Sequence, residues 1–208
     1  MGERLAGGNI AIALLANTIA TGAALVALIL AFGPVSGAHF NPAVTVADAS
    51  QGGLRWADAG AYIAAQVAGA FVGVALADAM FDQPLFAWSH HVRAGGSQLL
   101  SEAVATFGLL AVIQACARRR KDAVPFAVGA YITSAYWFTA STSFANPAVT
   151  LARSATDTFA GIRGADVPGF VIAQIVGAAC ATLLFRWLTP ALPAVAEHDV
   201  VSHERVRV

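Results

Sequence analysis

The sequence contains few charged residues. Of its 208 residues, 12% are charged and 58% are hydrophobic. The 12 basic and 12 acidic side chains balance to a net charge of zero, so no basic field attracts nucleic acid. So low a charge fraction excludes an ordinary soluble domain. We therefore expect a membrane protein with the lipid bilayer as a partner, and no nucleic-acid partner.

Residues that form catalytic, metal-binding or cofactor-binding sites are also scarce. The two cysteines, Cys116 and Cys180, both fall in apolar stretches, where we expect small buried hydrophobic residues and not a disulfide or a metal site. No nucleophile–base pair and no glycine-rich phosphate loop is evident. We therefore expect neither an enzyme nor a bound cofactor or metal.

Long apolar stretches dominate the chain. A span of about 20 apolar residues crosses a bilayer of roughly 30 Å. Five stretches approach or reach this length: Ile10–Phe32, Ala59–Ala77, Ser97–Ala117, Val124–Ala140 and Val167–Leu188. We expect Gly33-Pro34 to end the first stretch. The fold class is therefore predicted to be all-α and membrane-spanning.

A five-residue phrase occurs twice. The run Asn41 to Thr45 reads Asn-Pro-Ala-Val-Thr and returns unchanged from Asn146 to Thr150. Asparagine is a favoured helix cap and proline is tolerated at the first helical position, so each copy predicts a helix start. The expected helices, over residues 41–51 and 146–155, each reach only about half the membrane at 1.5 Å per residue. Two such interruptions in matching positions indicate a transport site.

The order of the spans predicts the topology. Three spans separate the two phrases, so the two loops enter from opposite faces and their half-helices meet near the midplane. The basic run Arg118–Lys121 is expected in the cytoplasm. The chain then divides into repeats over residues 1–96 and 97–190 and a cytoplasmic tail over 191–208. The first repeat has one span before its phrase and the second has two. We therefore expect either a missing first span or a genuine five-span variant.

These motifs resemble the aquaporin, or major intrinsic protein, family. The run Gly33 to Val44 and the run Ser143 to Ala148 are similar to the family's two signature loops, and Glu102 to Phe107 resembles the opening of each family repeat. The resemblance covers residues from about 9 to 190. It implies an inverted repeat with two opposed re-entrant half-helices, a homotetramer with one pore per subunit, and a bacterial inner-membrane location.

The chemistry of the repeated phrase suits a pore. The side-chain oxygens of Asn41 and Asn146 can accept from N–H groups of their own half-helices, which turns the amide donors into the pore. Positive helix ends also converge there and disfavour cations and protons. Pro42, Ala43, Pro147 and Ala148 complete the two motifs; carbonyls of Gly37, Ala38, His39, Ser143, Phe144 and Ala145 are expected to line the approaches.

Glu102 lies inside an apolar span, where a charge needs a partner. The resemblance makes it a structural brace that accepts N–H groups of the second loop. The alternative is a proton-coupling carboxylate in an ion-driven transporter.

The resemblance also implies a selectivity filter. Its four positions are Thr21, Ser134, Ser143 and Val149, and most relatives carry arginine where this chain has Val149. We therefore expect a wide, uncharged constriction, unless neighbouring aromatic rings narrow it. Arg153 is one helical turn further along and is expected to give the outer vestibule a displaced positive charge; the alternative is a solvated or headgroup arginine.

Some bacterial members of the family that lack this arginine are associated with arsenic-resistance genes. The resemblance therefore implies a passive channel for small neutral solutes: arsenite or other metalloid hydroxides, methylated arsenicals and glycerol-like polyols. The alternatives are an orthodox water channel, a truncated non-functional product, and, in another class, an ion-coupled secondary transporter.

Overall fold

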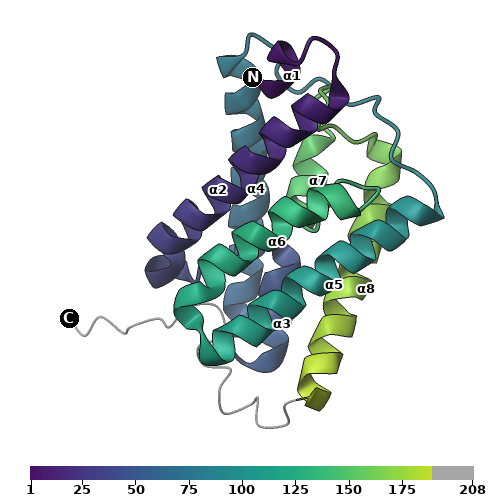
Figure 1. Cartoon of the computed structure of the whole chain (residues 1–208). Coiled ribbons are helices and arrows are strands. Elements are labelled where there is room, and N and C mark those ends of the chain that lie inside the picture. Colours follow the sequence, from purple (N-terminus) through teal and green to yellow (C-terminus); the bar gives the residue numbers. More distant parts are fainter. Residues whose placement is uncertain (189–208) are drawn as a thin grey trace.

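The computed structural model describes residues 1–188, and this part of the chain is all-α, as predicted (Figure 1). The predicted tail, residues 191–208, lies outside the described residues. In chain order the elements are α1 (Gly2–Leu5), α2 (Ile10–Ser36), α3 (Pro42–Gln51), α4 (Trp56–Met80), α5 (Gly96–Arg119), η1 (Lys121–Ala123), α6 (Val124–Phe138), α7 (Pro147–Arg153), η2 (Gly164–Asp166) and α8 (Val167–Leu188).

Most of the predicted spans form helices of membrane-crossing length. Within residues 1–188, four segments are long and apolar enough to cross: α2, α4, α5 and Gly164–Leu188. Helix α6 has 15 residues, or about 22 Å, and is shorter than the predicted span. The half-helices α3 and α7 have 10 and 7 residues. Figure 1 shows α7 toward the end that holds the N-terminus and α3 toward the opposite end.

The prediction that Gly33-Pro34 ends the first span is wrong. Helix α2 continues through Pro34 to Ser36 and ends at Gly37, whose φ is 73°. Pro34 lies in the last turn, where its missing N–H removes one helical hydrogen bond and few residues follow. Gly37 ends the helix because it adopts the left-handed conformation without strain. Helix α7 ends at Arg153, two residues before the predicted end.

Small residues allow two pairs of long helices to pack closely. Helix α5 packs along α8, and α2 packs along α6. A Cβ added at Gly177 of α8 would collide with the carbonyl oxygen of Ala103 in α5. At Gly69, the matching residue of α4, an added Cβ would meet nothing within 4 Å. The α8 packing face is therefore filled by α5, whereas the equivalent α4 face has no such helix among residues 1–188.

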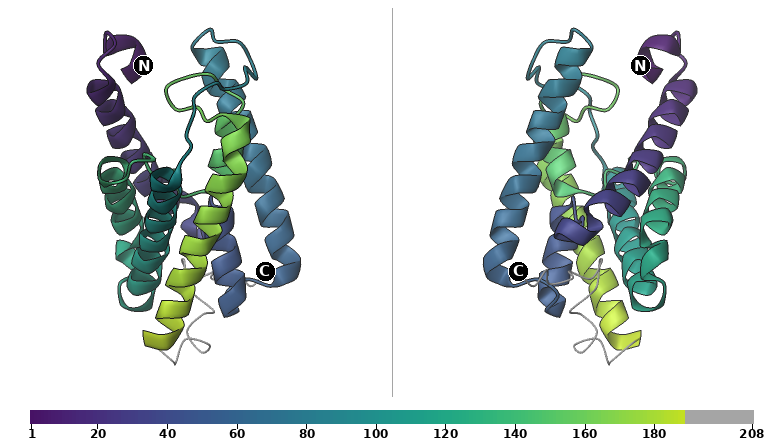
Figure 2. Two further views of the ribbon diagram at one scale, coloured as in Figure 1. Left: turned by 90° about the vertical axis from the view of Figure 1, so that its right-hand side faces the viewer. Right: turned by 90° about the vertical axis from the view of Figure 1, so that its left-hand side faces the viewer.

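A groove lies between α2, α4 and α7. It has a volume of about 690 Å³, and small residues of α4 and α7, including Ala70, Gly73 and Ala152, form part of its wall. Asn17 contributes from α2, and Figure 2 shows α2 and α4 diverging toward the end that holds the N-terminus. Helix α4 instead makes its main contacts with α3 and α7. The two repeats are thus alike in their half-helices and unlike in their outer packing.

The two matched glycines give a direct test of this difference. We expect Gly177→Ala to destabilise the protein by roughly 1–3 kcal/mol, because the methyl group overpacks the α5–α8 contact. The matched control, Gly69→Ala, should change stability little. Thermal unfolding in detergent measures both; equal losses would contradict the assigned packing.

Candidate functional site

Asn41 connects the two half-helices. It caps α3 by accepting a hydrogen bond from the backbone N–H of Ala43 at 2.9 Å. Its Nδ2 donates to the carbonyl oxygen of Ala145 at 2.7 Å, 104 residues further along the chain. The side chain therefore starts its own half-helix and holds the loop of the other repeat.

Asn146 makes the reciprocal connection. Its side-chain oxygen accepts from the N–H groups of Ala148 and Val149 at 3.0 and 3.3 Å, and its Nδ2 donates to the carbonyl oxygen of Phe40 at 2.8 Å. A carboxamide nitrogen carries two hydrogens. Each asparagine therefore uses one on the opposite loop and retains one for a solute.

A cavity of about 140 Å³ runs past this junction. Its wall includes many residues expected at the pore: Thr21, Ala38, His39, Asn41, Ser143, Phe144, Ala145, Asn146, Val149 and Arg153. The remaining wall is largely aliphatic, from Leu25, Ile29, Val44, Leu109, Ile113, Val124, Val128 and Ile132. Gly37, Pro42, Ala43, Pro147 and Ala148 belong to the motifs but do not line it. Most of the polar groups therefore come from the half-helices and loops, and most of the aliphatic side chains come from the long helices α2, α5 and α6.

Ser134 does not lie where the resemblance put it. It is exposed, its hydroxyl donates to the Tyr131 carbonyl at 2.7 Å, and it does not line the cavity. Tyr136, two residues further on, lines it instead. Residues two apart on a helix point in different directions, so a small error in counting changes the face. The four-residue spacing of the α6 lining residues, which ends at Tyr136, was the signal that could have identified it.

The lining loops have the same unusual backbone in both repeats. Ala38 and Phe40 have φ values of 49° and 49°, and the matching Ser143 and Ala145 have 50° and 47°. Non-glycine residues in this left-handed region cost roughly 1–2 kcal/mol each. The strain is therefore concentrated in the two loops that line the cavity, and other contacts have to stabilise them.

Glu102 stabilises the second loop. It is fully buried in α5, and its two oxygens accept the backbone N–H groups of Phe144 and Ala145 at 2.9 and 2.8 Å. Gln174 of α8 donates to the same carboxylate at 2.6 Å and to the hydroxyl of Thr150 at 2.8 Å. These bonds tie α5, α7, α8 and the loop into one network.

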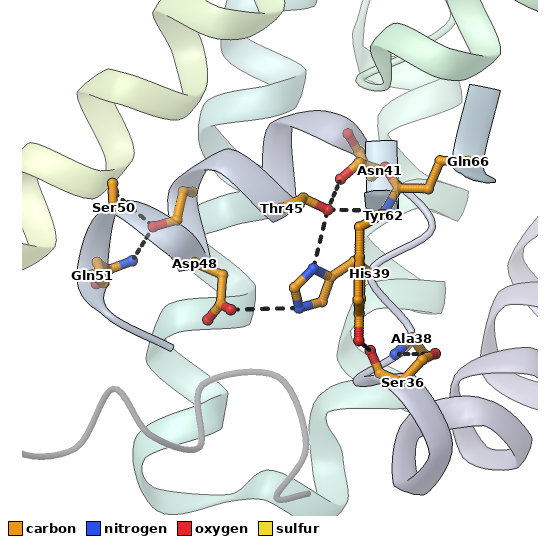
Figure 3. Close-up of polar contacts among 11 residues, drawn as sticks. Ser36, Ala38, His39, Asn41, Thr45, Asp48, Ser50, Gln51, Tyr62 and Gln66 are labelled. Atoms are coloured by element: carbon orange, nitrogen blue, oxygen red, sulfur yellow. Dashed lines mark hydrogen bonds and ion pairs between the residues drawn. The ribbon is translucent and has the colours of Figure 1, made fainter. Parts of the chain in front are cut away.

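The first loop is held by a different set of side chains (Figure 3). Gln66 of α4 donates to the Thr45 hydroxyl at 2.9 Å, as Gln174 does to Thr150. The His39 ring lies between α3 side chains, with Nδ1 3.1 Å from the Thr45 hydroxyl and Nε2 3.6 Å from an Asp48 carboxylate oxygen. Asp48 was not predicted from the sequence. Its position two turns into a buried half-helix could have indicated that its carboxylate needs a partner.

Arg153 reaches the cavity wall. Its guanidinium donates to the Tyr136 hydroxyl at 3.3 Å and its Cζ lies 4.3 Å from the centre of the Phe144 ring. The Tyr136 hydroxyl is also 3.4 Å from the Thr21 hydroxyl. The cavity wall therefore carries a positive charge from a residue one turn beyond Val149. The physical reason is that helical side chains lean toward the helix N-terminus, which directs Arg153 back toward Val149.

Arg93 is a second cation that sequence reasoning missed. It comes from the loop between α4 and α5, and its guanidinium donates to the carbonyl oxygens of Ser141, Phe159 and Gly161 at 3.1, 3.2 and 2.8 Å. Its Cζ lies 4.8 Å from the Phe144 ring centre. Burial lowers the pKa of Arg93 to about 10, so it remains charged at neutral pH. No motif in the sequence marks this residue.

Comparison with known proteins identifies the architecture. A family model described as major intrinsic protein matches residues 4–140 and 120–207. The chain belongs to the major intrinsic protein family. It is therefore a membrane channel protein for water or small solutes, and channels of the major intrinsic protein family are not enzymes.

Two relatives match most of the chain. Aquaglyceroporin AqpS of Rhizobium meliloti is 60% identical over 188 residues, covering 90% of this chain and 81% of that protein. Probable aquaporin AqpM of Archaeoglobus fulgidus is 35% identical over 184 residues, covering 79% of this chain and 72% of that protein. The similarity to both spans the two half-helix repeats of the major intrinsic protein fold.

Replacing Glu102 tests the network around the second loop. We expect Glu102→Gln to lower stability by roughly 3 kcal/mol, because an amide NH₂ cannot accept from the buried N–H donors. Flux of water or small solutes into proteoliposomes should fall with it. Glu3→Gln is the matched control, since the exposed Glu3 also accepts a backbone N–H, from Phe159 at 3.2 Å. Unchanged unfolding of Glu102→Gln would contradict the assigned role.

Proposed function

We propose that this protein is a passive channel for small neutral hydroxylated solutes. The solutes are arsenite and other metalloid hydroxides, methylated arsenicals, and glycerol-like polyols. One observation carries the proposal: the cavity wall combines the amide donors of Asn41 and Asn146 with aliphatic side chains from α2, α5 and α6. A polyol likewise combines hydroxyl groups with a carbon skeleton. The 60% identity to a protein named an aquaglyceroporin supports the assignment.

The filter in this proposal consists of Thr21, Tyr136, Ser143 and Val149. All four line the cavity, and Thr21 and Tyr136 bring hydroxyl groups within 3.4 Å of each other. Val149 is too short to close the passage as an arginine there would. The short side chain of Val149 leaves room for a solute larger than water. The hydroxyl groups of Thr21, Tyr136 and Ser143 provide polar contacts for that solute.

Passive transport accounts for Glu102 better than ion coupling does. Both of its oxygens accept hydrogen bonds from the second loop, and Gln174 donates as well. A carboxylate with this many donors serves to hold the loop. A coupling site would need it to exchange protons with the cavity, and Glu102 does not line the cavity.

The proposal includes the assembly and orientation implied by the family. Four copies form a tetramer with one pore each, in the bacterial inner membrane, with Arg118–Lys121 in the cytoplasm. Large exposed apolar side chains on the long helices, among them Val72 and Leu76 of α4 and Leu183 of α8, support contact with lipid or neighbouring subunits.

Swelling of proteoliposomes in glycerol and arsenite gradients tests the proposed solutes. We expect both to enter faster than into protein-free vesicles, without an ion gradient and without saturation. Fast water flux with no entry of either solute would contradict the proposal.

Val149→Arg tests the filter in the same assay. We expect it to lower glycerol flux by about tenfold, equivalent to about 1.4 kcal/mol of barrier, because the long side chain fills the passage. Val92→Arg, at an exposed position outside the cavity, is the matched control and should leave the flux unchanged. Equal fluxes for the two variants would argue against a filter at Val149.

A further inference from the structure

Val149 leaves the proposed filter without a cation at the position where, by the family resemblance, most relatives carry one, yet a guanidinium lies in the cavity wall. We propose that Arg153 determines the charge selectivity of this pore, in place of an arginine at position 149. This inference rests on the proposed channel function and deepens it. It assigns to one residue the exclusion of cations and the donation of hydrogen bonds to the solute.

The Arg153 side chain is long enough to place its guanidinium where an arginine at position 149 would place its own. Arg153 is four residues after Val149 on α7, so the two lie on one face, about 6 Å apart along the axis. The arginine side chain leans toward the start of the helix and covers that distance. Both residues line the same cavity. The positive charge therefore arrives at the level of Val149 while its backbone stays one turn away.

Two aromatic residues hold the guanidinium there. The Phe144 ring centre is 4.3 Å from Cζ, within the range of a favourable cation–π contact. The Tyr136 hydroxyl accepts one of the five guanidinium N–H groups at 3.3 Å. Phe144 is in the lining loop and Tyr136 is on α6, so the contacts come from two elements. Other N–H groups of the fork can serve a hydroxylated solute.

The neighbouring charges reinforce the effect. Arg93 contacts the same Phe144 ring, so two positive groups lie at this end of the cavity. The nearby carboxylate, Glu102, is engaged by the backbone of Phe144 and Ala145 and does not line the cavity. A cation in the cavity therefore meets two guanidinium groups against one buried carboxylate, a net positive charge, whereas a neutral solute meets hydrogen-bond donors.

The experiment measures cation and glycerol permeation in one preparation of proteoliposomes. A pH-sensitive dye and a sodium indicator inside the vesicles report leak, and swelling reports glycerol. We expect Arg153→Gln to raise the ratio of cation leak to glycerol flux by about tenfold or more, because a unit charge a few ångströms away is removed. Arg153→Lys, which keeps the charge, should stay near the wild-type ratio. Tyr136→Phe, which removes one holding contact, should give a smaller rise.

Control variants separate charge from folding. Arg55→Gln removes an exposed arginine outside the cavity and should leave the ratio unchanged. The double substitution Val149→Arg with Arg153→Gln should return the cation leak itself to the wild-type level, because it restores a cation at the same level; its glycerol flux should stay low, as in Val149→Arg. If Arg153→Gln fails to assemble, Tyr136→Phe still tests the inference, and an unchanged ratio in that variant would count against it.

Two results would overturn the inference: an unchanged ratio in Arg153→Gln, or a raised cation leak in Arg153→Gln that the double substitution does not lower. Failure of the channel proposal looks different, because the wild-type protein would then pass no glycerol above protein-free vesicles.

Discussion

The reciprocal hydrogen bonds of Asn41 and Asn146 are the interaction on which the rest of the structure depends. Each donates to a loop carbonyl of the opposite repeat, at 2.7 and 2.8 Å. Irregular backbone at membrane depth is tolerated only where protein or a polar cavity satisfies it, since an unpaired group in hydrocarbon costs several kcal/mol. Neither re-entrant loop meets this condition alone. The two half-helices therefore form a single unit, and the cavity exists because they do.

The two repeats support these loops by unlike means. The second loop is held by the buried carboxylate of Glu102 on the neighbouring long helix. The first loop relies on its own half-helix, through His39, Thr45 and Asp48. A glutamine from a long helix reaches the half-helix threonine in both cases. The shared contacts lie at the half-helices, and the differences lie where, within residues 1–188, no helix packs on α4 as α5 packs on α8.

The charge of the cavity wall depends on the length of one side chain. A valine at position 149 leaves space, and the guanidinium of Arg153 reaches back along α7 into the wall of the same cavity. Phe144 contributes twice, because its backbone N–H binds Glu102 and its ring contacts Arg153. Phe144 therefore connects Glu102, which holds the second loop, with Arg153, which supplies the positive charge of the cavity wall.

The all-α membrane fold and the opposed half-helices could be predicted from the residues alone. Both follow from local signals, the long apolar runs and the Asn-Pro starts, because helix formation and bilayer crossing depend on short stretches of chain. The end of α2 was misjudged at Pro34, since a proline in a last turn costs little and the left-handed Gly37 decides the end.

Tertiary structure alone decided the composition of the cavity wall. The choice of Tyr136 over Ser134, the placement of Arg153, and the burial of Arg93 depend on which helix faces meet and how far long side chains extend. Those contacts join residues distant in the chain, and their geometry is set by packing and not by sequence spacing.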